Sequence, residues 1–313
     1  IPDILPFITA ANSEVPYFIL DAMEKADDPA YKPYLIAFLK NSKPDIREYS
    51  LRILCKSFGK SVIPDIMPML DDNDSYVRYS AMKGIIEIAG KEIVPDMLKL
   101  LRSENANARA SAIAALSELD EKSASAEIFS MLSDKAGDIR YQALVALKAR
   151  NWTDESMLET IAIMLKDSDS EVRQQAMQIL EKFKYTAALP DILPLLKDSD
   201  EYIRINALKT LSAINDEKTM LEILPLLKDS SKRVRREAVQ AVGGLCRKSQ
   251  AIDKTAIDHL ILSLNDGDED VRNAVLYELG YAGDKSTIPA ISMMLKDVDA
   301  EVRNSAAKAI IEL

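Results

Sequence analysis

The side chains best able to act as bases, nucleophiles or metal ligands are few and scattered in this chain. It has one histidine, His259, and two cysteines, Cys55 and Cys246, far apart in the sequence. A catalytic dyad or triad around His259 can be written down, but no Gly-x-Ser-x-Gly elbow or cysteine–histidine signature accompanies it. A zinc site needs a closer cluster of cysteine and histidine, and no phosphate-loop, dinucleotide or EF-hand motif occurs. The sequence therefore predicts no catalytic residue, no metal and no cofactor, and we expect a protein that is not an enzyme.

Arginine is the charged residue whose spacing is regular. From Arg47 onward an arginine recurs at intervals of 31, 31, 31, 33, 31, 31, 37 and 31 residues. The series is Arg47, Arg78, Arg109, Arg140, Arg173, Arg204, Arg235, Arg272 and Arg303. One further step back reaches Pro16, inside a segment with the same apolar pattern, so we count about ten units. A period of this length is typical of helical-repeat arrays.

Aspartates precede the arginines at two fixed distances. The aspartates at a distance of four residues before an arginine, such as Asp74 and Asp200, are well placed to cap the helix that follows. The aspartates at a distance of six residues before an arginine are Asp72, Asp167, Asp198, Asp229, Asp266 and Asp297. A cation near a helix N-terminus is disfavoured by the helix dipole, so we expect these carboxylates to compensate for it. We predict an Asp–Arg ladder along the turns, in which each arginine reaches its own or the adjacent loop, formed by Arg47, Arg78, Arg140, Arg173, Arg204, Arg235, Arg272 and Arg303.

The element that must position each arginine is a helix with one apolar stripe. In the unit of Arg78 this stripe is Val77, Ala81 and Ile85, and the other units repeat it with few exceptions. These positions are four residues apart and therefore lie on one face of a helix, which we call helix B. A second apolar segment, helix A, precedes it in each unit. Together the two segments predict a repeating helix–turn–helix unit.

Prolines mark two positions of helix A. Prolines at a distance of fourteen residues before the arginine position suit the first helical turn, where the missing N–H has no partner in any case. They are Pro2, Pro33, Pro64, Pro95, Pro190 and Pro289. Prolines at a distance of ten residues before the arginine position are Pro6, Pro68, Pro194 and Pro225. At the second position proline removes a backbone hydrogen bond and clashes with the preceding turn. We therefore predict a kink in helix A there.

The D-x-x-V-R-x-x-A-x-x-A-L rhythm, clear in "LLKDSDEYIRINALKTL" from Leu195 to Leu211, and the proline within helix A resemble HEAT repeats. The 31-residue form resembles the HEAT-like repeats of bilin lyases and of many prokaryotic scaffold proteins. The resemblance covers essentially the whole chain. It implies an all-α, right-handed α-solenoid, an armadillo-like superhelix of about ten two-helix HEAT-like repeats, as a single domain over residues 1–313.

Two junctions between repeats are irregular. One lies near 148–156, where the interval of 33 residues contains the only tryptophan, Trp152. The other lies near 243–255, where the interval of 37 residues contains Gly243 and Gly244 in tandem. Insertions of this kind map to loops. We expect the glycine pair either to bend the superhelix or to end a helix early, and neither junction is taken as a domain boundary.

The exposed face of helix B is the expected site of function, because the resemblance places these helices on the concave side. Exposed tyrosines offer a large contact area and a polar group, which suits binding interfaces. We predict a non-catalytic scaffold that binds a protein or peptide partner through Tyr49, Tyr76, Tyr79, Tyr141, Tyr202, Arg236 and Tyr277. Tyr49, Tyr76 and Tyr79 could form one aromatic patch.

Two other functions remain open from the sequence. Some HEAT-like proteins are bilin lyases, so an enzyme or chaperone of that type is one alternative. The other is a nucleic-acid binder that uses the basic patch of repeat eight, which comprises Lys228, Lys232, Arg233, Arg235, Arg236, Arg247 and Lys248. The net charge of −10 argues against nucleic acid as a partner.

Composition limits the setting of the protein. No apolar run approaches the ~18 residues of a membrane span, so we expect no membrane insertion. The two cysteines fit a reducing compartment, and a cytoplasmic location is expected. The chain begins with Ile1 and ends without a terminating signal, which indicates a fragment of a longer chain or a processed one. The sequence does not indicate an oligomeric state.

Overall fold

A computed structural model describes residues 15–214, 216–248 and 254–313. Within these ranges the regular structure is entirely helical, and no β-strand occurs. The chain divides into two compact units, with the boundary between Trp152 and Thr153. This boundary lies inside the first irregular junction. The single-domain expectation stays a prediction, and the two units are described separately.

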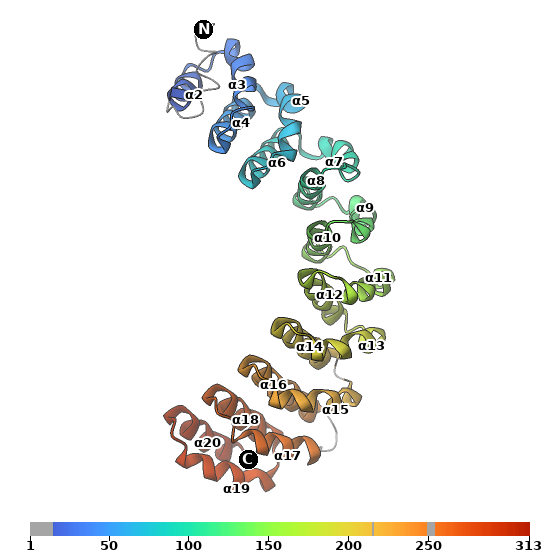
Figure 1. Cartoon of the computed structure of the whole chain (residues 1–313), viewed down its shortest axis with the longest axis vertical. Coiled ribbons are helices and arrows are strands. Elements are labelled where there is room, and N and C mark those ends of the chain that lie inside the picture. Colours follow the sequence, from blue (N-terminus) through green and yellow to red (C-terminus); the bar gives the residue numbers. More distant parts are fainter. Residues whose placement is uncertain (1–14, 215, 249–253) are drawn as a thin grey trace. The chain divides into compact units, whose positions relative to one another are not determined.

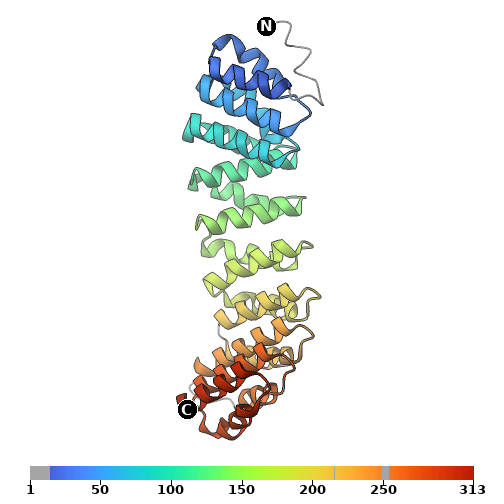
Figure 2. The same cartoon turned by 90° about the vertical axis from the view of Figure 1, so that its left-hand side faces the viewer.

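The first unit alternates helices between two layers (Figure 1). Its B helices are α2 (Val15–Ala26), α4 (Pro44–Phe58), α6 (Ser75–Ala89), α8 (Ala106–Glu118) and α10 (Gly137–Ala149). Its A helices are α3 (Lys32–Phe38), α5 (Ile63–Ile66), α7 (Val94–Leu100) and α9 (Ser125–Ser130). Successive B helices pack side by side, as Figure 2 shows. The described part of the unit is therefore an all-α solenoid of two-helix layers.

The second unit repeats this arrangement. Its A helices are α11 (Leu158–Ile163), α13 (Leu189–Ile192), α15 (Met220–Ile223), α17 (Lys254–Ser263) and α19 (Ile288–Met293). Its B helices are α12 (Ser170–Phe183), α14 (Glu201–Ile214), α16 (Lys232–Lys248), α18 (Glu269–Ala282) and α20 (Ala300–Glu312). Short 3₁₀ helices lead into the A helices at η2 (Pro29–Tyr31), η3 (Gly59–Val62), η5 (Gly90–Ile93), η6 (Lys122–Ala124), η8 (Glu155–Met157), η10 (Thr186–Ala188), η12 (Glu217–Thr219) and η14 (Lys285–Thr287).

The apolar stripe of helix B forms the core of each layer. In α6, the side chains of Val77, Ala81 and Ile85 are all buried. Leu70, the last large apolar residue of the preceding A segment, is buried as well. The small alanine in the middle of the stripe lets the neighbouring helix approach closely. A single layer cannot bury both of its faces, so each layer depends on its neighbours for stability.

Proline determines where helix A changes from α to 3₁₀ geometry. With Pro68, helix α5 ends at Ile66 and the 3₁₀ helix η4 (Met67–Asp71) follows. Pro194 in η11 (Leu193–Lys197) and Pro225 in η13 (Leu224–Lys228) have the same effect. The matching segments without this proline remain α-helical for longer. Of these, α9, α11 and α19 end in η7 (Met131–Ser133), η9 (Met164–Lys166) and η15 (Met294–Lys296), whereas α3, α7 and α17 are not followed by a 3₁₀ helix. The predicted kink is thus a change of helix type, while Pro2 and Pro6 lie outside the described residues.

The tandem glycines do not end a helix. Helix α16 runs through Gly243 and Gly244 as far as Lys248. The expectation of an early helix end was therefore wrong, because packing of the helix outweighs the low helix propensity of glycine. The rest of the second irregular junction, residues 249–253, lies outside the described residues.

Candidate partner-binding face

Asp229 illustrates how a ladder aspartate joins two consecutive repeats. Asp229 accepts a hydrogen bond from the Ser231 amide (2.8 Å), which closes its own loop. Both of its carboxylate oxygens also accept from Arg204 of the preceding repeat, at 2.9 Å from Nε and 2.8 Å from the terminal nitrogen. The other terminal nitrogen of Arg204 donates to the carbonyl of Asp198 in its own loop (2.8 Å). One guanidinium therefore contacts its own loop and the next one together.

This cross-loop pair recurs along the described residues. The pairs are Arg47–Asp72, Arg109–Asp134, Arg173–Asp198, Arg204–Asp229, Arg235–Asp266 and Arg272–Asp297. Arg78, Arg140 and Arg303 each donate to a carbonyl of their own loop. For Arg78 the matching position of the next loop is Ser103, which offers no carboxylate. The arginines of this series therefore bond to carboxylates and carbonyls of the protein itself.

The charge of these aspartates is stabilised by the arginines. Burial by itself raises the pKa of Asp72, but the Arg47 guanidinium and the Asp74 amide outweigh burial and hold that pKa below its usual value. The same balance lowers the pKa of Asp134, Asp229 and Asp297. The aspartates four residues before the arginines cap helix B: Asp74, for example, accepts from the amides of Tyr76 (2.9 Å) and Val77 (3.2 Å). The loops are thus held by cooperating polar contacts.

The predicted partner-binding residues differ in accessibility. Tyr76 and Tyr79 on α6 are 78% and 58% exposed, and Tyr202 on α14 and Tyr277 on α18 are exposed too. Arg236 on α16 is exposed. Tyr141 on α10 and Tyr49 on α4 are half-buried.

Tyr49 is held by side chains of α2 and α4, and the single aromatic patch with Tyr76 and Tyr79 stays a prediction. Its hydroxyl donates to Glu24 of α2 (3.0 Å), and the Arg52 guanidinium lies 4.6 Å from its ring centre. Tyr76 and Tyr79 instead line two different hollows between α4 and α6. Helix α6 therefore presents two exposed aromatic rings to a partner.

The two hollows adjoin one another and form one groove, which we call the α4–α6 groove. The first has a volume of about 340 Å³ and includes Tyr76, and the second has a volume of about 490 Å³ and includes Tyr79. Glu48 and Ser80 line both, and the Ser80 hydroxyl donates to the Glu48 carboxylate (3.2 Å). The groove therefore continues along neighbouring B helices beneath two exposed rings.

Gly84 shapes the floor of the second hollow. A Cβ atom at this position would lie 2.4 Å from the Cys55 sulfur, so the two helices can approach only with glycine here. Burial raises the pKa of the Cys55 thiol to about 11. The thiol is accordingly protonated at neutral pH, which fits a packing residue better than a nucleophile.

A buried carboxylate in the second unit was not foreseen from the sequence. Glu278 on α18 is 3% exposed, forms an ion pair with Arg247 and packs against Gly243 of α16. Burial raises the pKa of Glu278, although Arg247 opposes this effect. The position six residues after the arginine carries small or apolar side chains in most repeats, so a glutamate there was a signal. Gly243 makes the space, since a Cβ atom would lie 2.0 Å from the Glu278 carboxylate.

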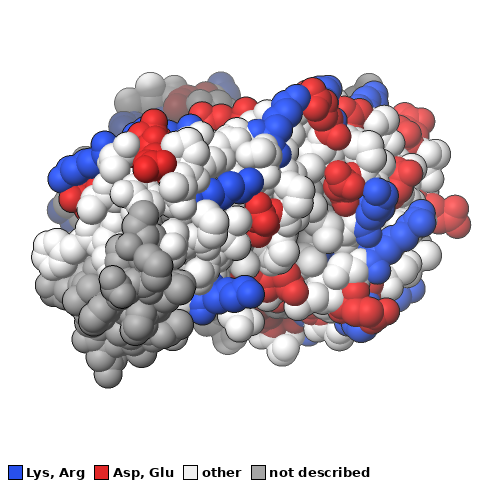
Figure 3. Space-filling view, turned by 90° about the horizontal axis from the view of Figure 1, so that it is seen from above, with Lys and Arg blue, Asp and Glu red and all other residues white. Residues whose placement is uncertain are grey.

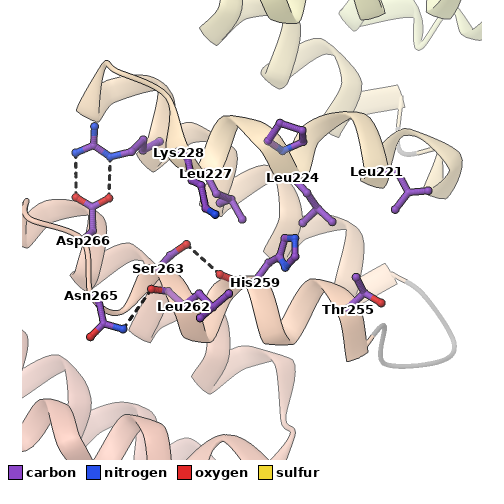
Figure 4. A pocket seen from close by; sticks show the side chains of 12 residues that line it. Leu221, Leu224, Leu227, Lys228, Thr255, His259, Leu262, Ser263, Asn265 and Asp266 are labelled. Carbon is purple, nitrogen blue, oxygen red and sulfur yellow. Dashed lines mark hydrogen bonds and ion pairs between the residues drawn. The ribbon is translucent and has the colours of Figure 1, made fainter.

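His259 lies in a hollow of about 490 Å³ between η13 and α17, together with a serine and an aspartate (Figure 4). The Ser263 hydroxyl donates to the His259 backbone carbonyl (3.0 Å) rather than to the imidazole. Asp266 accepts both bonds of the Arg235 guanidinium. The three side chains are therefore not arranged as a Ser-His-Asp triad.

The basic patch of repeat eight is largely paired with neighbouring carboxylates. Lys232 bonds to Asp268 (2.8 Å) and Arg235 to Asp266. Arg233 lies near Glu201 (3.5 Å) and donates to the Tyr202 hydroxyl (3.0 Å). Arg247 is held by Glu278, whereas Lys228 and Arg236 are exposed. Most of the positive charge in the described part of the patch is therefore offset locally.

Charges of both signs are mixed on the face drawn in Figure 3, where lysine and arginine are interspersed with aspartate and glutamate among uncharged residues. No helix among the described residues is sufficiently long and apolar to span a bilayer. The described residues also contain no cluster of three side chains able to ligate a metal.

Comparisons with known proteins agree with this fold. An engineered protein covers 99% of the chain and 98% of its own length (17% identity, TM-score 0.54). The Escherichia coli protein YibA covers 85% of the chain and 97% of its own length (22% identity, TM-score 0.60). Importin beta covers 95% of the chain with 48% of its own length (14% identity, TM-score 0.64). At these identities the likeness concerns the fold alone.

No curated protein sequence matches the chain. The family model of HEAT repeats, however, matches residues 63–148, 158–243 and 220–311. These matches cover most of the chain and include the arginine and aspartate positions from Asp72 to Arg303. On this basis, and on the two-helix layers joined by an Asp–Arg ladder, the chain belongs to the HEAT-repeat family.

Proposed function

We propose that this chain is a non-catalytic scaffold that binds a segment of a protein partner in the α4–α6 groove. The observation that carries the proposal is the exposure of Tyr76 and Tyr79 above two adjoining hollows. Tyrosine is enriched at binding hot spots, because its ring offers a large, rigid contact and its hydroxyl a hydrogen bond. Two such rings side by side on one helix are a surface suited to a partner.

The rigidity of the groove supports the same proposal. Its walls are B helices packed through the buried stripe of Val77, Ala81 and Ile85, and Arg47 joins the two loops in front of them through Asp72. A preformed groove requires little ordering of the protein when a partner binds, so more of the contact energy appears as affinity. The bilin-lyase-type and nucleic-acid-binding alternatives, and the cytoplasmic location, stay predictions.

The test is a selection from a displayed library of random dodecapeptides against the whole chain. Peptides that are enriched are then measured by fluorescence anisotropy against wild type and the double variant Tyr76→Ala/Tyr79→Ala. We expect the double variant to bind at least about 30-fold more weakly, because two hot-spot side chains contribute ~2 kcal/mol or more. Both rings are exposed, so the variant keeps its core and its circular dichroism spectrum.

Phe18→Ala is the matched control. Phe18 on α2 is 70% exposed in the same unit, but it lines neither hollow. Its replacement removes a similar aromatic surface and is expected to leave affinity unchanged. Peptides that bind the double tyrosine variant as tightly as wild type would show that the α4–α6 groove is not the binding site.

A further inference from the structure

We infer that the α4–α6 groove selects a partner segment with separated charges, whose basic residue lies in the hollow beside Tyr76 and whose acidic residue lies near Lys56 and Lys83. This inference rests on the proposed function and specifies the chemistry of its partner. It follows from a difference in charge between the two ends of the groove, which lie at the two ends of the same pair of helices.

The hollow beside Tyr76 is acidic. Asp45, Glu48 and Asp74 line it, and no lysine or arginine does. All three carboxylates accept hydrogen bonds from neutral donors: Asp45 from the Tyr17 hydroxyl, Glu48 from Ser80, and Asp74 from backbone amides. Among the described residues none of the three forms an ion pair, so their negative charge is not cancelled locally.

A lysine or arginine side chain matches this hollow in charge and in shape. The exposed Tyr76 ring at its rim can contact a cation through its face. Lys43 and Arg47 are the cations nearest in sequence to Asp45, and neither lines the hollow. Lys43 lies over the Tyr17 ring (5.8 Å to its centre), and Arg47 pairs with Asp72. A partner's cation would therefore enter a site that this chain leaves without one.

The hollow beside Tyr79, unlike the one beside Tyr76, is lined by cations as well as carboxylates. Arg52, Lys56 and Lys83 line it, opposed by Glu48 and Glu87. Arg52 and Lys56 share a single carboxylate, Glu24, at 3.5 and 3.3 Å.

The ion pairs at this end can be exchanged. Lys83 pairs with Glu118 at 3.2 Å, with both side chains 45% exposed. Surface ion pairs of this kind contribute little to stability. The cations can consequently exchange their present partners for a carboxylate of a bound segment.

The length of the helices sets the spacing of the two charges. At a rise of about 1.5 Å per residue, Asp45 and Lys56 are roughly 17 Å apart along α4. An extended peptide covers this distance in about five residues at ~3.3 Å each. The segment expected in the groove thus carries a lysine or arginine and an aspartate or glutamate separated by about four intervening residues.

The test uses the peptides enriched in the dodecapeptide selection and two charge-removing variants. Asp45→Asn/Glu48→Gln neutralises the acidic hollow while keeping side-chain size and hydrogen-bond acceptors. Lys56→Gln/Lys83→Gln removes the positive charge at the other end while keeping an N–H donor on each side chain. Each variant is combined with peptides whose basic residue is replaced by norleucine or whose acidic residue is replaced by the amide.

We expect each protein variant to weaken binding about 3- to 10-fold. The loss should disappear when the peptide lacks the matching charge, because coupled residues give non-additive effects. Coupling of the peptide's basic residue with Lys56 and Lys83, or no coupling at either end, would overturn the charge order while the tyrosine dependence upholds the proposed function. If no enriched peptide depends on Tyr76 and Tyr79, the proposed function fails, and this inference fails with it.

Discussion

Replacing Arg47 with alanine should reveal how much the Asp–Arg ladder contributes to stability. Arg47 donates to both carboxylate oxygens of Asp72 (2.7 and 2.6 Å) and to the carbonyl of Asn41 (2.8 Å). Arg47 also donates to the carbonyl of Ser42 (3.2 Å), and the substitution removes all four bonds. It also leaves Asp72, whose side chain is 8% exposed, with only the Asp74 amide as a donor in its own loop.

The expected loss is about 3 kcal/mol of unfolding free energy. Removing one member of a buried ion pair costs ~3–5 kcal/mol, because the other charge stays buried without its partner. The Asp72 carboxylate keeps the Asp74 amide bond, which places the expected value at the lower end of that range. The substitution does not disturb the apolar stripe, since Ile46 beside it remains buried in the core.

Arg78→Ala is the control, because Arg78 occupies the same position in the next repeat of the same unit. It donates to the carbonyls of Asp72 (2.6 Å) and Asn73 (3.1 Å) but faces Ser103 where a ladder carboxylate would be. We expect it to lose only ~1 kcal/mol, the contribution of its hydrogen bonds. Urea unfolding followed by circular dichroism measures both. Equal losses in the two variants would refute the argument that the cross-loop pair stabilises the stack.

Three further predictions concern buried groups. Gly243→Ala should destabilise the protein by ~1–3 kcal/mol in urea unfolding because its Cβ would collide with Glu278, whereas Gly244→Ala, whose nearest side-chain atom is 3.4 Å away, should not. Glu278→Gln should raise the free energy of unfolding by about 1 kcal/mol at pH 7 and lose this advantage below about pH 4. The reason is that a carboxyl group with a raised pKa weakens the fold as pH rises. An equal gain at both pH values would contradict this prediction. The lowered pKa of Asp72 predicts the opposite: wild-type stability should fall below about pH 4, and Arg47→Ala should show a smaller fall in the same titration.

The helices and their caps were predictable because their signals are local. The stripe of Val77, Ala81 and Ile85 depends only on helical periodicity, and Asp74 caps a helix that begins at the next residue. The Asp–Arg spacing also repeats in the sequence. This spacing did not specify whether each arginine contacts its own loop or the adjacent one. In the structure, Arg204 makes both contacts.

The candidate site was less predictable because its geometry depends on neighbouring helices. Tyr49 and Tyr76 are both tyrosines near the start of a B helix, yet Glu24 of α2 binds Tyr49 while Tyr76 remains exposed. Similarly, the sequence predicted a bend or an early helix end at Gly243, whereas the structure places it against Glu278, which lies one repeat later. Such contacts require the relative placement of two helices, which hydrophobic periodicity alone does not specify.

The location of a bound peptide tests the central proposal most directly. A peptide enriched in the selection, carrying a photoreactive benzoylphenylalanine, is cross-linked to the whole chain, and the adducts are mapped by peptide mass spectrometry. We expect adducts on α4 and α6, close to Tyr76 and Tyr79, and their loss in the presence of excess unlabelled peptide. Adducts confined to the A helices or to the second unit would contradict the assignment of the α4–α6 groove as the partner-binding site.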